Sequence, residues 1–184
     1  LKEVIEGKLN VFKEEELNVE LVIFDDALEL YTDAADYALR TATAKGESVV
    51  KARNAPDELV ISADTVVVRK DKILEKPRDD DHARDMLSKL SGKTHKVITG
   101  VALFHKGRSC GFHASTKVTF SKLTAAAIDD YVATGDPLDK AGGYGIQGRA
   151  GCFVEGIDGC YHNVVGLPVN RLARELQGFL ADQW

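Results

Sequence analysis

The run from Glu58 to Arg69, ELVISADTVVVR, limits the possible folds more than any other part of the sequence. It is almost entirely apolar and β-branched, which predicts a strand covered on both faces of a sheet. Asp64 lies inside this run, and a buried carboxylate costs several kcal/mol unless a cation or metal pairs with it. The sequence therefore predicts either a functional carboxylate or a bulge that turns Asp64 outward to cap a loop.

The rest of the chain alternates strand-like and helix-like segments. Periodicity and turn signals predict helices over 33–51, 79–90, 124–134 and 168–182, and strands over 19–24, 58–69, 73–74, 94–105 and 109–121. The segments 152–157 and 161–165 are interpreted as short strands or loop edges. The dipeptide Lys106-Gly107 indicates a hairpin rather than a crossover. The expected class is therefore α/β, with a mixed twisted sheet flanked by helices.

Length and charge narrow the functional classes. A chain of 184 residues favours one domain over 1–184, with a polar lead-in over 1–18. The 24 basic and 29 acidic side chains give a net charge of −5, which argues against nucleic acid polymers as partners. No apolar run approaches the roughly 20 residues that span a bilayer, so no membrane association is expected. Three cysteines without a CxxC pair favour free thiols in the cytoplasm over disulfides.

Two lysines are considered, and the local sequence brings only Lys76 toward Asp64. A turn at 70–72 folds the chain back, so Lys76, held extended by Pro77, can return toward Asp64. The alternatives are a surface lysine beside a helix start and a plain ion pair. Lys45 lies on the first predicted helix, where taken alone it is interpreted as a solvated lysine.

The segment 139–151 is rich in glycine, with Tyr144, Ile146 and Gln147 between the glycines. Glycines let a ligand approach the backbone and expose N–H groups to phosphate or to base edges. The spacing matches neither a Walker A motif nor a dinucleotide fingerprint. A binding loop is favoured over a flexible linker or a purely structural role. His95 and His162 are given no role, since a lone histidine on a strand or loop is more often structural.

Several motifs, taken in order, resemble the Maf family of septum-formation-associated nucleotide pyrophosphatases, which is related in fold to the inosine triphosphatases. The resemblance runs from about residue 33 to the C-terminus and rests on ADTVV (63–67), ILEKP (73–77), MLSKLSG (86–92), TGV (99–101), DKAGGYGIQG (139–148) and NVVGLP (163–168), with His95.

The resemblance implies hydrolysis of a nucleoside triphosphate to the monophosphate and pyrophosphate with a divalent metal, Mg²⁺ or Mn²⁺. Asp64 would hold the metal or activate water, and Lys76 and Lys45 would contact the phosphates. Gln147 would read the pyrimidine edge of dTTP or UTP, with Thr65 assisting. The two further substrate-binding positions are Gly145 and Asp26. A cytoplasmic homodimer is also implied.

One departure keeps alternatives open. The family begins with a strand and a Ser-x-x-Pro-Arg-Arg loop that binds the triphosphate, and no such motif occurs in this sequence. Either the sequence starts downstream of that loop or this variant lacks it. The alternatives to a dTTP/UTP pyrophosphatase are the same chemistry on another base, such as 7-methyl-GTP, and a non-catalytic nucleotide-binding or regulatory module.

Overall fold

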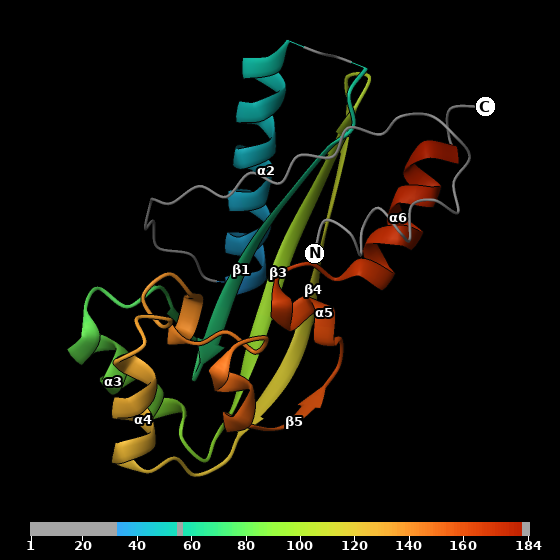
Figure 1. Cartoon of the computed structure of the whole chain (residues 1–184). Coiled ribbons are helices and arrows are strands. Elements are labelled where there is room, and N and C mark those ends of the chain that lie inside the picture. Colours follow the sequence, from blue (N-terminus) through green and yellow to red (C-terminus); the bar gives the residue numbers. More distant parts are fainter. Residues whose placement is uncertain (1–32, 55–56, 182–184) are drawn as a thin grey trace.

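The computed structural model describes residues 33–54 and 57–181, and it contains a five-stranded sheet with the order β2-β1-β3-β4-β5 (Figure 1). Every pairing between these strands is antiparallel. The strands are β1 (Val60–Arg69), β2 (Lys72–Leu74), β3 (Thr94–His105), β4 (Arg108–Phe120) and β5 (Val154–Asp158). The helices are α2 (Ala34–Arg53), α3 (Asp80–Leu90), α4 (Ala125–Val132), α5 (Tyr161–Val165) and α6 (Val169–Ala181), with 3₁₀ turns η1 (Ala141–Gly143) and η2 (Arg149–Phe153).

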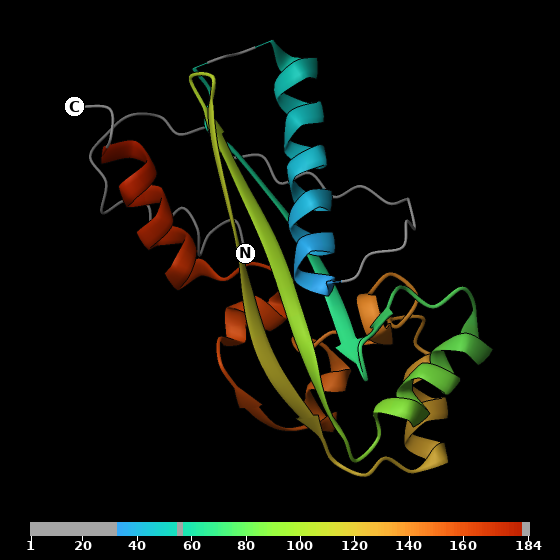
Figure 2. The same cartoon turned by 180° about the vertical axis from the view of Figure 1, so that it is seen from behind.

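The helices form layers on both faces of the sheet. Helix α2 crosses one face, and α5 and α6 lie on the other (Figures 1 and 2). Helices α3 and α4 pack at the lower end of the face that carries α6, over a cluster that includes Val67 of β1 and Val97 of β3. The predicted α/β class with helices flanking the sheet is confirmed, and the sheet expected to be mixed is antiparallel throughout the described residues. Strand β1 is covered on both faces, as its composition predicts.

The two tight turns occur where the sequence predicts them. Lys70 and Asp71 have φ of 49° and 59°, and Lys106 and Gly107 have φ of 48° and 74°. Two consecutive residues with positive φ form the turn whose twist matches that of the flanking strands. The first turn joins β1 to β2, and the second joins β3 to β4.

One expectation is wrong, because residues 161–165 form the helix α5 and not a strand or loop edge. The carbonyl oxygen of Cys160 accepts hydrogen bonds from the backbone N–H groups of Asn163 and Val164, which closes a helical turn. Gly166, with φ of 125°, then ends the helix. The valines in this stretch favour a strand locally, but these tertiary and capping contacts prevail. The strand expected over 19–24 lies outside the described residues.

Candidate functional site

The centre of the candidate site is an ion pair between helix α2 and strand β1. The ammonium nitrogen of Lys45 lies 2.6 Å from Oδ1 of Asp64. The two side chains are only 6% and 16% exposed. Residues 60–68 of β1 pair without interruption with 104–96 of β3, so no bulge turns Asp64 outward. Asp64 therefore has a cationic partner in Lys45 of α2, the lysine that the local sequence alone indicates to be solvated.

Small residues bring α2 close enough to the sheet for this pair to form. Gly100 of β3 lies directly opposite Asp64, and a Cβ at Gly100 would lie 2.4 Å from backbone atoms of Ala38 and Leu39. Ala38 is completely buried. One turn further along the helix, the Ser62 hydroxyl donates to the carbonyl oxygen of Ala42 at 2.7 Å. The helix thus packs directly on the sheet backbone, and Lys45 is buried. The interpretation of Lys45 as a solvated lysine, which its local sequence suggests, is therefore wrong.

The segment that carries Lys76 is attached to the glycine-rich segment. The backbone N–H of Gly142 donates to the carbonyl oxygen of Glu75 at 3.0 Å. A Cβ at Gly143 would lie 3.2 Å from Cγ of Pro77. The register Val67↔Leu74 sets Lys76 two residues past the last paired position of β2, near the level of Thr65. The chain therefore folds back after the turn at 70–72, and the segment that carries Lys76 contacts the glycine-rich segment. The return of Lys76 toward Asp64 stays a prediction.

Thr65 lies on the face of β1 opposite to Asp64. Its hydroxyl oxygen lies 2.9 Å from that of Thr99 and donates to the carbonyl oxygen of Gly166 at 3.4 Å. The Thr99 hydroxyl in turn donates to the carbonyl oxygen of Asn163. These contacts tie the turn after α5 to the sheet. The geometry gives Thr65 a role in anchoring the 163–168 motif, away from the carboxylate of Asp64.

The predicted base-reading residues lie in the glycine-rich segment. Gln147 is exposed, and Gly145 is half-buried. The N–H of Gly145 donates to the hydroxyl oxygen of Tyr131 at 3.4 Å, which ties this part of the segment to α4. Asp26, the remaining candidate, lies outside the described residues.

Two residues that the sequence analysis left without a role, His95 and Tyr144, are joined beneath the segment. Nε2 of His95 and the Tyr144 hydroxyl lie 2.7 Å apart, and both side chains are buried. Burial, and to a smaller extent the charge of Arg69, lowers the pKa of His95 to about 4. Burial raises the pKa of the Tyr144 phenol above its ordinary value of 10. The alternation of β3, which places His95 on the same face as Val97, is the sequence signal for this burial.

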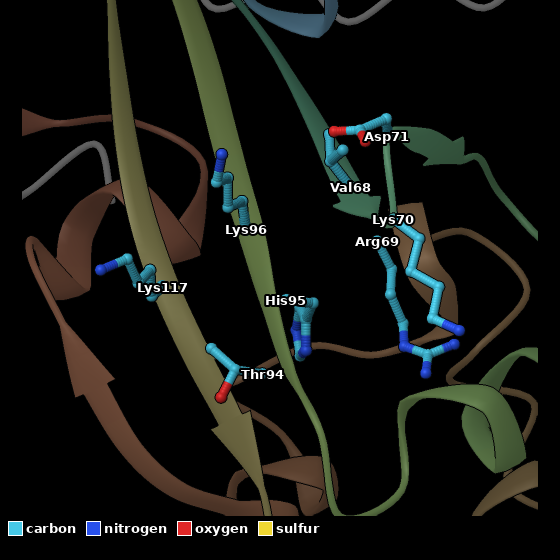
Figure 3. Close-up of a pocket in the computed structure, with 8 residues that line it drawn as sticks. All are labelled: Val68, Arg69, Lys70, Asp71, Thr94, His95, Lys96 and Lys117. Carbon is cyan, nitrogen blue, oxygen red and sulfur yellow. The ribbon is translucent and has the colours of Figure 1, made fainter.

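A separate hollow of about 260 Å³ lies near the end of β1 and does not include any predicted site residue (Figure 3). It is lined by Val68, Arg69, Lys70, Asp71, Thr94, His95, Lys96 and Lys117. Its charged groups point in different directions, and the Lys117 ammonium pairs with Asp158 at 3.2 Å. A ligand would meet no converging set of charges, so this hollow is not a second candidate site.

The resemblance implies a divalent metal, and the donor groups of the described residues limit how such a metal could be bound. Within residues 33–54 and 57–181, no group of three or more His, Cys, Asp or Glu side chains could hold a metal ion. Mg²⁺, however, is commonly bound by one or two carboxylates together with substrate phosphates and water. The Asp64 carboxylate has this donor chemistry. The described residues therefore suit a metal shared with a phosphate-bearing ligand better than a metal held by the protein alone.

Comparisons with known proteins show the family of the chain. The sequence model of the Maf-like protein family matches residues 8–179 of the chain. A dTTP/UTP pyrophosphatase of Bacillus cereus (strain B4264) is 46% identical over 158 residues, which cover 86% of this chain and 82% of that protein. A dTTP/UTP pyrophosphatase of Bacillus thuringiensis subsp. konkukian (strain 97-27) has the same identity and coverage.

Proposed function

This chain belongs to the Maf family, and we propose that it is a nucleoside triphosphate pyrophosphatase that hydrolyses dTTP and UTP to the monophosphate and pyrophosphate. The observation that carries the proposal is the mostly buried ion pair of Lys45 and Asp64. The 46% identity to dTTP/UTP pyrophosphatases supports the choice of base.

The lysines supply the positive charge that the reaction requires. Cleavage between the α and β phosphates forms a bond from a water oxygen to phosphorus and breaks the bridging P–O bond, whose electron pair leaves with pyrophosphate. Positive groups fixed in a water-poor site stabilise the charge that develops on the phosphate oxygens. Lys45 is already desolvated by α2, so it meets the phosphates without much further loss of hydration. Lys76, two residues past the end of β2, is assigned a second contact with the phosphates.

Asp64 is the group that orients and deprotonates the attacking water or ligates the metal. In the structure its Oδ1 accepts from Lys45, which keeps the carboxylate oriented within a mostly buried site. A bound Mg²⁺ would neutralise phosphate charge and acidify coordinated water. When a triphosphate enters, Lys45 can move its contact from the carboxylate to a phosphate oxygen, and the carboxylate then becomes available to water or metal.

Gln147 is assigned the selection of the base. Its amide presents a donor and an acceptor side by side, which match O4 and N3–H of thymine and uracil. A site built to make such hydrogen bonds strongly disfavours a base that leaves them unpaired.

The location and assembly of the protein are proposed as well. We place the enzyme in the cytoplasm, since Cys110, Cys152 and Cys160 are free thiols, as expected in a reducing compartment. No helix among the described residues is long and apolar enough to cross a membrane. The homodimer stays a prediction, which light scattering on the purified protein would check.

Pyrophosphate release tests the proposed function. Release from dTTP, UTP, CTP and 7-methyl-GTP is measured with Mg²⁺, for this chain beside an Asp64→Asn control. Turnover of dTTP or UTP that the Asn variant lacks is the expected result. Preference for 7-methyl-GTP would refute the assigned base, and tight nucleotide binding without turnover would favour a non-catalytic binding module.

A further inference from the structure

We propose that His95 and Tyr144 are positioning residues that fix the glycine-rich segment against the sheet, and so set the place of Gln147 relative to the Lys45–Asp64 pair. The inference rests on the proposed function for its consequence in base selection. That the buried hydrogen bond between His95 and Tyr144 holds the glycine-rich segment is inferred from the contacts of these two residues alone.

Tyr144 is the side chain through which the segment enters the core. Its ring packs edge-to-face against His95 at a centroid distance of 5.4 Å and against Phe120 at 4.7 Å. Tyr144 and Phe120 belong to the cluster that also joins α3 and α4 to the sheet. Such contacts alone would hold a phenylalanine equally well, so packing does not explain the hydroxyl.

The hydroxyl of Tyr144 has a specific function in this packing. It meets Nε2 of His95 at 2.7 Å, and both side chains are buried. A buried donor or acceptor without its partner is strongly unfavourable, so the pair permits one placement of the Tyr144 ring and penalises shifted ones. The lowered pKa of His95 agrees with a neutral ring in this contact. The hydrogen bond thus determines the position of the Tyr144 ring, while the aromatic contacts stabilise its packing in the core.

The backbone next to Tyr144 transmits this position to the site. Gly142 and Gly143 have φ of 70° and 73°, values that residues other than glycine rarely adopt. A Cβ at Gly142 would also lie 2.9 Å from the side chain of Val67. The N–H of Gly142 is bonded to the carbonyl oxygen of Glu75, next to Lys76. Gln147 follows Tyr144 by three residues. One anchor therefore serves both the phosphate-binding segment and the base-reading segment.

The experiment compares two ways of breaking the contact with a matched control. Tyr144→Phe removes the hydroxyl and keeps the ring, and His95→Leu removes the ring nitrogen. His95→Gln, whose amide nitrogen can stand near the place of Nε2, is the rescue. Thr116→Val is the control, because it deletes buried hydrogen bonds to Cys160 and Asn163 on the same face of the sheet without touching the segment. All variants are assayed well below their unfolding temperatures.

Two readouts are taken on each variant. Hydrogen exchange is measured on peptides that cover 139–148 and 75–78, with peptides from α6 as the internal reference. The ratio of kcat/KM for UTP to that for CTP is measured alongside. We expect Tyr144→Phe and His95→Leu to speed exchange in both peptides at least tenfold and to lower the UTP preference about tenfold, and His95→Gln to recover much of both.

The control separates positioning from general destabilisation. Thr116→Val is expected to lower the unfolding temperature while it leaves local exchange and base preference unchanged. The inference is overturned when Tyr144→Phe behaves like Thr116→Val, with lower stability but unaltered exchange and preference. Failure of the parent chain to turn over any pyrimidine nucleotide would refute the proposed function instead, and the exchange measurement would still decide whether the hydrogen bond holds the segment.

Discussion

Replacement of Gly100 by alanine tests whether the close approach of α2 to the sheet creates the candidate site. The new Cβ would lie 2.4 Å from the carbonyl carbon of Ala38 and the amide nitrogen of Leu39. Non-bonded carbon contacts are comfortable at about 3.5–4.0 Å, so the helix must move outward by about 1 Å. Backbone atoms cannot rotate aside as a flexible side chain can, and the strain is therefore shared by the whole helix.

The expected magnitudes follow from that displacement. Overpacking a filled core costs about 1–3 kcal/mol, and a clash with helix backbone belongs to the upper part of that range. For a chain of this size, about 2–3 kcal/mol corresponds to a fall in Tm of about 4–12 °C. A shift of about 1 Å at a catalytic group can lower the rate about 100-fold. Lys45 moves with the helix, so dTTP turnover is expected to fall by about that factor.

Thermal unfolding by circular dichroism and pyrophosphate release below Tm measure the two effects. Gly156→Ala in β5 is the matched control, because a Cβ there meets nothing within 4 Å. Its Tm and turnover are expected to match the parent chain. A Gly100→Ala variant with unchanged Tm and turnover would refute the reasoning that this glycine sets the distance between helix and sheet.

Three further predictions concern single side chains. Lys45→Met removes an ammonium partner of the mostly buried Asp64 carboxylate, so urea denaturation should show a loss of about 3–5 kcal/mol in the free energy of unfolding. Lys45→Met combined with Asp64→Leu should regain that stability without regaining turnover, and unchanged stability of Lys45→Met would contradict the prediction. His95 has a folded pKa of about 4 against 6.5 in the unfolded chain, so the unfolded state binds the extra proton between these values. The free energy of unfolding should then fall by about 3 kcal/mol as pH drops from 6.5 to 4. The urea midpoint of His95→Gln should not show this fall, and a midpoint that still falls equally with pH would mean that another group causes the pH dependence. Gln147→Ala, at an exposed position, should keep stability within about 0.5 kcal/mol and lose about tenfold in UTP-over-CTP preference, and a retained preference would remove Gln147 from base selection.

Local patterns in the sequence predicted most of the fold. The apolar β-branched run gave β1, and Lys106-Gly107 gave the β3–β4 hairpin, because each signal is short-range and has a single physical solution. Helix α5 was missed because its formation depends on the Cys160 carbonyl and on Gly166, and not on the propensity of its valines. Such contacts leave no periodic trace in five residues.

The candidate site was predictable in its residue types and less so in its geometry. A carboxylate inside an apolar strand signals that a partner exists, but periodicity does not say which lysine reaches it. Burial of Lys45 depends on Gly100 and Ala38, which lie on two different elements. The pairing of His95 with Tyr144 depends on the tertiary placement of a loop 49 residues away. Long-range contacts of this kind are absent from local patterns.

The alternation of β1 also affects how faithfully the chain reaches its native state. Asp64 faces Lys45 on one side of the sheet, and Thr65 faces Thr99 on the other. Since side chains alternate between faces, a slip of one residue against β3 would exchange them. The carboxylate would then enter the apolar layer beneath α6, and Lys45 would be buried facing a hydroxyl. A misaligned sheet would be severely destabilised, so the residue assigned to hydrolysis also acts as a check on strand alignment during folding.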